Sequence, residues 1–342
     1  MRPAKKQKAY ACAGVDVDLG NRLKRRIQQL VTQTHGPQVL GKIGGFGGLF
    51  RVQFPGMRAP VLVASIDGVG TKLKIAFALD RHDTIGADLV NHCANDIAVL
   101  GARPLFFLDY IGCGKLEPRV FDQLIRGFSR ACRAADCALI GGETAQMPGM
   151  YRNGEYDLAG CMVGVVDRAK IIDGSKSKPG GVILGLASNG LHTNGYSLAR
   201  KILFERMQLK INSRLPGSRS TVGAELLRVH KNYQSLLAKV RRGMIKGLAH
   251  ITGGGLIDNL PRILPRNCDA VIETKRWRVP RIFQILQRNG DVDLAEMYQV
   301  FNMGIGMVAV VAEGDAKRTM SILRAKRIGQ IKRGSGKTRL TL

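Results

Sequence analysis

Residues 65–72 (S-I-D-G-V-G-T-K) place a carboxylate, two glycines and a lysine directly after a short apolar run. Gly68 and Gly70 would let the backbone approach a ligand, Lys72 could neutralise a phosphate, and Asp67 could hold Mg²⁺. The spacing is not that of a P-loop, G-x-x-x-x-G-K-[ST]. This motif alone fits a phosphate site and a plain glycine turn with a solvated lysine equally well.

A second glycine-rich segment lies at residues 43–49, where four glycines surround Phe46; they are Gly44, Gly45, Gly47 and Gly48. Such a loop could fold over a nucleotide because its backbone is conformationally permissive. A lone glycine-rich loop is weak evidence, and a flexible connection is the simpler interpretation.

Three further acidic residues end short motifs: Asp96, Asp109 and Glu143. Asp109 and Glu143 fall near predicted strand ends, as Asp67 does, where open α/β sheets bind their ligands. Together these carboxylates could coordinate the Mg²⁺ ions of a bound ATP. Ordinary capping would explain any one of them alone. Gly142 before Glu143, and the shaped loop at 147–151 after it, favour a functional role.

The second half of the chain carries two histidine-containing loops. Residues 188–197 join a predicted strand to a predicted helix, where backbone N–H groups with Asn194 and Ser197 suit a phosphate. His192 could hydrogen-bond a substrate or move a proton near neutral pH. At residues 250–255, His250 and Thr252 precede three glycines that could form a second anion cradle. The alternatives are a helix cap and structural histidines, the commoner role for a lone histidine such as His250.

The elements that must position these residues alternate between strand and helix patterns. Predicted strands cover 61–66, 105–111, 138–141 and 158–166, with helices over 21–34, 120–132 and a segment capped by Asp83-Thr84 that carries Ile85 to Leu100. After a polar, proline-marked stretch at 173–181, strands are expected at 182–187 and 304–311, and helices at 197–207, 224–240 and 280–287. We expect two layered α/β domains, residues 1–170 and 171–342.

Composition narrows the class of protein. In 342 residues that are 45% hydrophobic, no apolar run is long enough to span a bilayer. Seven scattered cysteines predict reduced thiols in a cytoplasmic protein. Zinc is not expected, because the six histidines form no ligand-spaced cluster with the cysteines.

The formal net charge of +27 is unusual, and residues 171–342 carry +19 of it. Such a balance favours anionic partners. Only 6% of the residues are aromatic, with one Trp, which leaves few platforms for stacking bases. A weak, salt-sensitive and non-specific affinity for nucleic acid is therefore the expectation, and a dedicated nucleic-acid-binding protein is the less favoured alternative.

Taken in order, the motifs resemble those of the phosphoribosylformylglycinamidine cyclo-ligase (AIR synthetase) family over nearly the whole chain. They are V-D-V-D at 15–18 before Gly20-Asn21, the glycines of 44–48, D-G-V-G-T-K at 67–72, H-D-T-I-G at 82–86, P-L-F-F-L-D-Y at 104–110, G-G-E-T at 141–144, H-T-N-G-Y-S at 192–197 and H-I-T-G-G-G at 250–255.

The resemblance implies ATP-dependent ring closure in purine biosynthesis. ATP phosphorylates the formyl amide oxygen of formylglycinamidine ribonucleotide, and the neighbouring nitrogen attacks the activated carbon to give aminoimidazole ribonucleotide. It also implies a homodimer whose N-terminal sheets join across the interface. Lys72, with Mg²⁺ on Asp67, Asp96 and Glu143, would face the ATP phosphates.

The implied roles of the remaining residues follow the same motifs. Lys72, His192 and His250 would be catalytic. ATP would be bound by Gly44, Gly45, Gly47, Gly48, Asp67, Gly68, Gly70, Thr71, Lys72 and Gly142. The ribonucleotide would be bound by Asn194, Gly195, Ser197, Thr252, Gly253 and Gly254.

Related families are less well matched. Selenophosphate synthetase would carry a reactive cysteine in the 43–49 loop, which has none. Thiamine-monophosphate kinase and hydrogenase-maturation proteins would not be expected to carry H-T-N-G-Y-S. A formylglycinamidine ribonucleotide synthetase-like enzyme remains the nearest alternative, although its chains are usually much longer. The general base for ring closure and the number of Mg²⁺ ions stay open.

Overall fold

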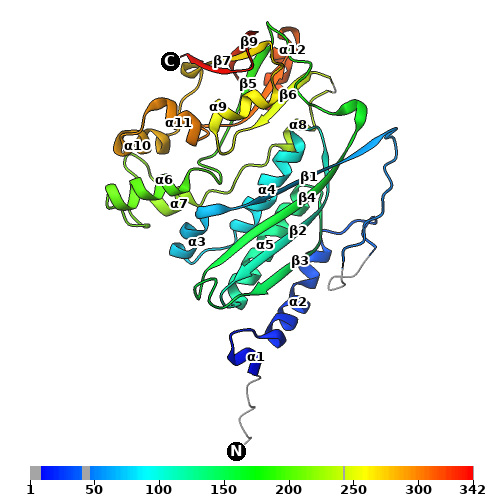
Figure 1. Ribbon diagram of the computed structural model, residues 1–342, viewed down its shortest axis with the longest axis vertical. Helices are drawn as coiled ribbons and strands as arrows, with labels where there is room; N and C mark the ends of the chain where they lie inside the picture. The colour runs from blue at the N-terminus through cyan, green and yellow to red at the C-terminus, as the bar shows by residue number, and fades with distance from the viewer. Residues whose placement is uncertain (1–8, 41–46, 242, 342) are drawn as a thin grey trace, which may run out of the picture.

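The computed structural model describes residues 9–40, 47–241 and 243–341, and it confirms an α/β chain with mixed sheets (Figure 1). A four-stranded sheet, in the order β1-β4-β2-β3, forms the N-terminal half. A six-stranded sheet, in the order β10-β7-β9-β5-β8-β6, forms the C-terminal half. Within these residues, no helix is long and apolar enough to cross a membrane.

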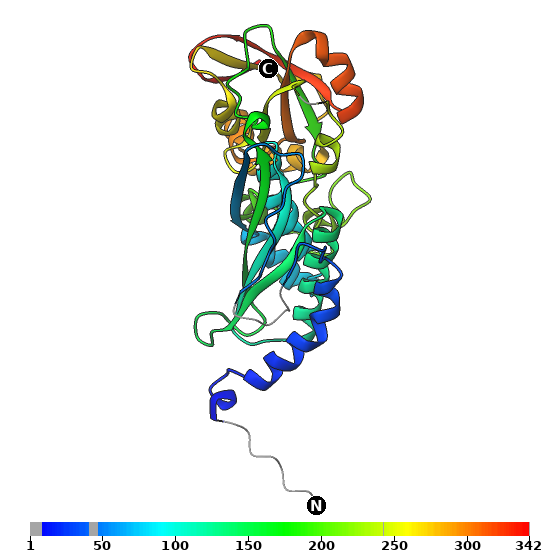
Figure 2. The ribbon, with the colours of Figure 1, turned by 90° about the vertical axis from the view of Figure 1, so that its right-hand side faces the viewer.

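The N-terminal sheet consists of β1 (Pro60–Gly68), β2 (Arg103–Cys113), β3 (Ala138–Gln146) and β4 (Tyr156–Asp167). Strand β4 pairs antiparallel with β1 and β2, whereas β2 and β3 are parallel. The helices are α1 (Ala9–Cys12), α2 (Val17–Thr32), α3 (Leu73–Leu79), α4 (Ile85–Ala98) and α5 (Pro118–Ala134). Helices α4 and α5 lie on one face of the sheet (Figure 2).

Local sequence explains most of these helices. Helix α2 begins after Asp16, whose carboxylate accepts from the Leu19 N–H at 2.8 Å, and it buries Leu23, Ile27 and Val31 on one face. The expected cap of α4 is wrong. Thr84 has helical dihedral angles and makes no side-chain cap bond, so packing fixes the start of α4.

One face of the N-terminal sheet is left exposed. Alternate residues of β1 point to opposite faces, and Ser65 and Asp67 contact α4. Leu62 and Ile66, on the other face, are 60% and 73% exposed. This apolar face, defined here by Leu62 and Ile66, has no helix of the described chain packed on it.

The C-terminal sheet consists of β5 (Val182–Ala187), β6 (Ile245–His250), β7 (Cys268–Glu273), β8 (Ile305–Val311), β9 (Lys326–Arg333) and β10 (Thr338–Thr341). Its helices are α6 (Tyr196–Arg200), α7 (Val222–Leu226), α8 (Gln234–Leu237), α9 (Gly255–Asn259), α10 (Arg281–Gly290), α11 (Leu294–Val300) and α12 (Glu313–Leu323). Every residue of β8 is buried. Helix α6 continues into a π-helical turn at Lys201–Arg206. The gap between β4 and β5 contains the predicted domain boundary, which stays a prediction.

The predicted helix over 224–240 is wrong. Helix α7 ends at Leu226 and α8 covers only Gln234–Leu237, with an irregular stretch at 228–233 that we call the junction segment. Side chains of the N-terminal half bind its backbone: Asn91 Nδ2 donates to the His230 carbonyl at 2.7 Å, and Asn95 Nδ2 to the Lys231 carbonyl at 2.9 Å. These bonds satisfy the carbonyls that a helix would have used internally.

Candidate active site

Strand β1 and helix α4 bring Asp67 and Asp96 together. His92 lies one turn before Asp96, with Nε2 2.8 Å from Asp67 Oδ2 and 3.7 Å from Asp96 Oδ2. Ser65 Oγ donates to Asp96 Oδ2 at 3.2 Å. We call the region where the two halves of the chain meet the junction, and the pair Asp67 and Asp96 at its edge the carboxylate rim. The side chains of these two residues are 37% and 29% exposed, so the carboxylate rim is accessible to a ligand.

The charges on the carboxylate rim reinforce one another. Burial would raise the pKa of Asp96, but hydrogen bonding and charge from His250, with the charge of His92, outweigh it and hold that pKa below its ordinary value. Burial likewise opposes protonation of His92, yet the hydrogen bond to Asp67 and the nearby carboxylates raise its pKa. Asp96 is therefore ionised near neutral pH, as a cation ligand must be.

Glu143 does not join this pair. The sheet register aligns Asp67 with Gly160, Gly160 with Asp109, and Asp109 with Gly142. Glu143 follows Gly142, so it lies about three strand spacings, roughly 14 Å, from β1. Within a single chain, Glu143 therefore lies too far from Asp67 and Asp96 to share an ion with them, and its role as a metal ligand stays a prediction.

The reason for this separation is the strand order. Strands β4 and β2 both lie between β1 and β3, so strand ends that follow one another in sequence do not become neighbours. Asp109 is packed under Gly142, where an added Cβ would meet its Oδ1 at 2.4 Å. Burial, helped by the charge of Glu143, raises the pKa of Asp109 to about 7.

Lys72 lies in the interior instead of facing a ligand. Its side chain is fully buried, and Nζ is 2.8 Å from Asp88 Oδ1. The same ammonium donates to the carbonyls of His192 at 3.2 Å and Arg228 at 2.6 Å. An ammonium has three N–H donors, and all three are used. This arrangement contradicts the expectation that Lys72 binds a phosphate. The lysine instead links the N-terminal half to the backbone of His192 and Arg228 in the C-terminal half.

The two C-terminal loops lie against the N-terminal motif. Thr71 Oγ1 is 3.1 Å from Ser197 Oγ, which links residues 65–72 to the loop that starts at His192. Asn194 Oδ1 lies 3.4 Å from the position of a Cβ on Gly253, so the loop at 252–255 is adjacent. The Asn194 amide nitrogen is buried without a hydrogen-bond partner in the described chain. An unsatisfied buried donor here indicates a place for a ligand acceptor.

Some of the predicted binding glycines are required by the fold itself. Gly195 has φ +76°, and a Cβ there would meet the ring of Phe301 at 2.3 Å. Gly254 has φ +93°, a region that favours glycine. These positions shape the loops whether or not a ligand is bound.

Four of the six histidines gather behind the carboxylate rim, namely His92, His192, His230 and His250. His92 Nδ1 is 2.9 Å from Thr193 Oγ1, which is 3.2 Å from His230 Nδ1. His230 Nε2 is 2.9 Å from His250 Nε2, whose Nδ1 is 2.8 Å from Asp96 Oδ1.

Sequence reasoning anticipated His192 and His250 but missed His92 and His230. The i, i+4 spacing of His92 and Asp96 on one helix face was an available signal for the first. Nothing local marked His230, because the junction segment is positioned by residues of the other half. Burial lowers the pKa of His192 and His230 well below the ordinary value and also lowers that of His250.

The glycine-rich loop is only partly covered by the structure. Gly44 and Gly45 lie outside the described residues. Gly47 and Gly48 are exposed, and a Cβ on Gly48 would meet Ile140 Cδ1 at 2.7 Å, so this end of the loop lies beside β3. Its expected role over a nucleotide stays a prediction.

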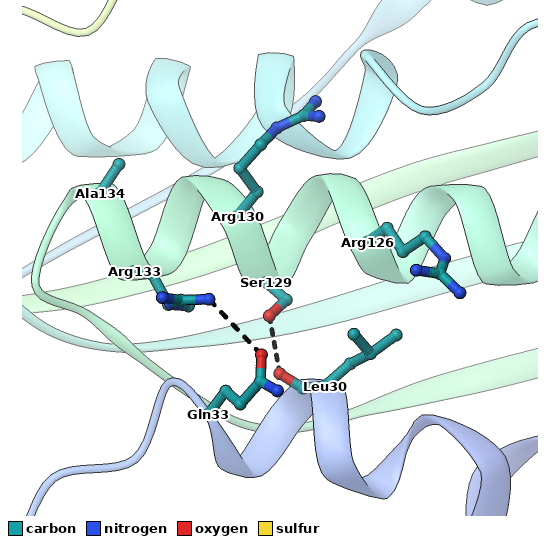
Figure 3. A pocket seen from close by; sticks show the side chains of 7 residues that line it. All are labelled: Leu30, Gln33, Arg126, Ser129, Arg130, Arg133 and Ala134. Atoms are coloured by element: carbon teal, nitrogen blue, oxygen red, sulfur yellow. Dashed lines mark hydrogen bonds between the residues drawn. The ribbon is translucent and has the colours of Figure 1, made fainter.

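A separate pocket of about 500 Å³ lies between α2 and α5 (Figure 3). Arg126, Arg130 and Arg133 line it from α5, and no acidic residue belongs to its described lining. Ser129 Oγ donates to the Leu30 carbonyl at 2.6 Å and closes its base. This pocket is a cationic surface feature that shares no residue with the carboxylate rim.

Comparison with known families covers both halves of the chain. Residues 56–166 match the AIR synthase related protein N-terminal domain, and residues 178–340 match the corresponding C-terminal domain. The chain is 52% identical over 335 residues to a phosphoribosylformylglycinamidine cyclo-ligase of Trichlorobacter lovleyi, covering 96% of each chain. It is 54% identical over 312 residues to the enzyme of that name from Citrifermentans bemidjiense, covering 91% of this chain and 90% of the relative.

Solved structures share the fold at low identity. Hydrogenase maturation protein HypE in complex with ATP superposes with a TM-score of 0.65 at 18% identity, over 92% of this chain and 90% of that one. Thiamine-monophosphate kinase from Stenotrophomonas maltophilia gives a TM-score of 0.65 at 17% identity, over 95% and 96%. These likenesses concern the arrangement of the two α/β halves.

Proposed function

The chain belongs to the phosphoribosylformylglycinamidine cyclo-ligase family, and from that premise we propose how its residues carry out the ATP-dependent closure of the imidazole ring. Phosphorylation of the formyl amide oxygen converts a poor leaving group into phosphate, after which the neighbouring nitrogen attacks the carbon. Positioning and charge neutralisation dominate such chemistry. One observation carries the assignment of residues: the rim formed by Asp67 and Asp96 lies beside the loops of His192 and Thr252.

We place Mg²⁺ and the ATP phosphates at the carboxylate rim. Asp67 and Asp96 are partly exposed oxygen donors already held close together, which is the donor chemistry that Mg²⁺ prefers. When bound, the ion neutralises phosphate charge. Gly68, Gly70 and Thr71 continue from Asp67 toward Ser197 and form the backbone side of this site. HypE, which has the same fold, was solved with ATP.

The ribonucleotide is assigned to the two C-terminal loops. The unpartnered Asn194 amide is available to an acceptor on the substrate. The other residues that we assign to the ribonucleotide belong to the same two loops: Gly195, Ser197, Thr252, Gly253 and Gly254. Within the described residues neither ring nitrogen of His192 has a hydrogen-bond partner, so we assign His192 to hydrogen-bond the attacking nitrogen. His250 orients Asp96. Lys72 acts as a positioning residue because its three donors are used within the protein.

The decisive experiment is formation of aminoimidazole ribonucleotide from formylglycinamidine ribonucleotide, ATP and Mg²⁺. Asp67→Asn is expected to abolish turnover while the thermal unfolding profile stays that of the wild type. Asp136→Asn, at an exposed turn, is the matched control and should retain activity. Absence of product from the folded wild-type enzyme, or full activity of Asp67→Asn, would overturn the assignment. The same assay excludes a formylglycinamidine ribonucleotide synthetase-like reaction, which consumes a different substrate.

We also propose a homodimer formed through the apolar face of Leu62 and Ile66. Two large aliphatic side chains, exposed on the same face of an edge strand with Ala64 between them, favour burial against a second copy. Light scattering should give twice the chain mass for the wild type and a smaller mass for Leu62→Lys/Ile66→Lys. All seven cysteines are free thiols, which agrees with the cytoplasmic location we propose.

A further inference from the structure

Three buried imidazoles converge at the centre of the junction. His192 follows β5, His230 lies in the junction segment, and His250 ends β6; they are 1%, 0% and 5% exposed. One ring nitrogen from each lies within 4.8 Å of the other two. The carboxylate rim uses the opposite side of only one of them, His250, through its Nδ1.

The hydrogen bonds around these rings direct one nitrogen of His230 and one of His250 toward the same point, with Asn95 Nδ2 3.5 Å from His250 Nε2. Because His250 Nδ1 donates to the Asp96 carboxylate, a neutral His250 presents a lone pair at Nε2. His230 Nδ1 is 3.2 Å from Thr193 Oγ1, and its Nε2 is 2.9 Å from His250 Nε2, a hydrogen bond that a bound metal would replace. Among the residues that the structure describes, His192 has no hydrogen-bond partner at either ring nitrogen. A ring held by a carboxylate or hydroxyl at one nitrogen, with the other nitrogen directed at a shared centre, is the arrangement of metal-ligating histidines.

We propose that His192, His230 and His250 bind one first-row transition-metal dication, for which zinc is the probe, at a site distinct from the Mg²⁺ rim. Imidazole nitrogens select zinc over magnesium, which prefers oxygen. The sequence expectation concerned histidines clustered with cysteines, whereas the site proposed here is formed by histidines alone.

The geometry requires only a small adjustment. Tetrahedral zinc with bonds of about 2.0–2.1 Å holds nitrogen ligands about 3.3 Å apart, close to the His230–His250 separation. His192 now stacks on His230, with ring centroids 4.1 Å apart, so it must turn toward the other two. No hydrogen bond from the described residues holds its ring, although Gly306 packs closely against it, since a Cβ there would lie 2.5 Å from His192 Cε1.

Metal at this site has a predictable consequence for the enzyme. A bound metal would link His250 at the end of β6 to His230 in the junction segment. It would also take up ring nitrogens of His192 and His250. Since the proposed function uses both histidines, zinc is expected to inhibit ring closure. This step rests on the proposed function, whereas metal binding itself does not.

The test measures metal content directly. The full chain is stripped with a chelator, equilibrated with zinc in the presence of millimolar Mg²⁺, freed of excess metal, and analysed by mass spectrometry. We expect one zinc per chain for the wild type and for His35→Gln, whose ring contacts the Leu139 carbonyl outside the site. His230→Gln should lower zinc affinity at least about 100-fold, and Thr193→Val, which removes a supporting hydroxyl, about 10-fold.

Several outcomes would overturn the proposal. Absence of stoichiometric zinc in the folded wild type would mean that the rings share a proton and not a metal. Zinc retained by His230→Gln but lost from Asp67→Asn would place the ion at the carboxylate rim. Cobalt substitution adds a spectroscopic check, because tetrahedral nitrogen ligation gives intense visible bands. Ring closure measured in zinc-free buffer reports separately on the proposed function, so failure of one leaves the other tested.

Discussion

Asp67 and Lys72 stand five residues apart in one motif, yet they belong to two different regions. Asp67 lies on the carboxylate rim, more than a third exposed, and Lys72 lies in the junction with no exposed surface. In sequence both read as ligand-binding charges. In the structure, one keeps an accessible face and the other is enclosed by partners from three separate segments. A charge whose donors are all used by protein serves the architecture, and one with an open face serves a ligand.

The energetics of the two regions differ for the same reason. Removing an ion from water costs several kcal/mol unless hydrogen bonds and an opposite charge offset it. The junction meets this requirement at Asp88 Oδ1, which accepts from Lys72 and from the His230 N–H at 2.6 Å, whereas Asp88 Oδ2 is buried without a hydrogen-bond partner among the described residues. The carboxylates of the rim need no such compensation, because solvent still reaches them. We therefore expect substitutions in the junction to alter stability first, and substitutions on the rim to alter turnover first.

The largest expected effect is that of Lys72→Met. It leaves Asp88 as a buried carboxylate without its counter-ion, which typically costs about 3–5 kcal/mol. Urea unfolding should show this loss in the free energy of unfolding, with any loss of turnover following from it. Lys74→Met, two residues on and exposed, is the control and should unfold like the wild type. A Lys72→Met enzyme of normal stability that has lost only turnover would return Lys72 to the phosphate.

On the rim, Asp96→Asn and Glu143→Gln should separate clearly. Asp96→Asn removes a carboxylate from the Asp67 pair, and we expect turnover about 100-fold lower, near 2.7 kcal/mol, with a higher Mg²⁺ requirement. Glu143→Gln lies across the sheet and should leave the Mg²⁺ requirement unchanged. Mg²⁺ titrations of the initial rate at saturating ATP measure both. An equal shift for Glu143→Gln would mean that the two edges meet at one ion, as a second chain could bring about.

A smaller effect is expected for Asn95→Ala in the junction. Asn95 donates to the Lys231 carbonyl and accepts from the Tyr233 N–H, both at 2.9 Å, so its loss leaves buried backbone groups unpaired. The cost should be about 2 kcal/mol, with faster hydrogen exchange at Tyr233. Asn153→Ala, in an exposed turn, is the control. Unchanged exchange at Tyr233 would show that packing alone fixes the junction segment.

Most elements of the fold were predictable because their signals are local. The periodicity of Leu23, Ile27 and Val31 and the apolar runs that became β1, β5 and β8 depend on neighbours in sequence. The helix expected over 224–240 failed because its carbonyls are bound by Asn91 and Asn95, more than 130 residues earlier. No pattern within the segment records those distant donors.

The part of the site that depends on neighbouring elements was likewise predictable from the sequence. Asp67 and Asp96 do meet, since a strand end and the helix packed on that strand are close by construction. Glu143 was misplaced because strand order cannot be read from strand positions. His92 and His230 were missed because their chemistry depends on Thr193 and His250, which only the closed junction brings within reach.

The smallest expected effect concerns cations that have neither a buried partner nor a ligand in the proposed reaction. Arg126, Arg130 and Arg133 are exposed along α5 (Figure 3), and replacing all three by Gln should change the free energy of unfolding by less than about 1 kcal/mol. The effect of replacing these arginines should instead appear in the affinity for nucleic acid. Because three exposed arginines lie along α5, the variant should lose part of the weak, salt-sensitive affinity for nucleic acid that the +27 charge predicts. Fluorescence anisotropy with a labelled oligonucleotide across a salt series measures this loss as a reduced salt slope.

If the slope is unchanged, the excess charge of the C-terminal half carries the affinity. If the variant unfolds as readily as Lys72→Met, exposure is no guide to which charges hold this fold together.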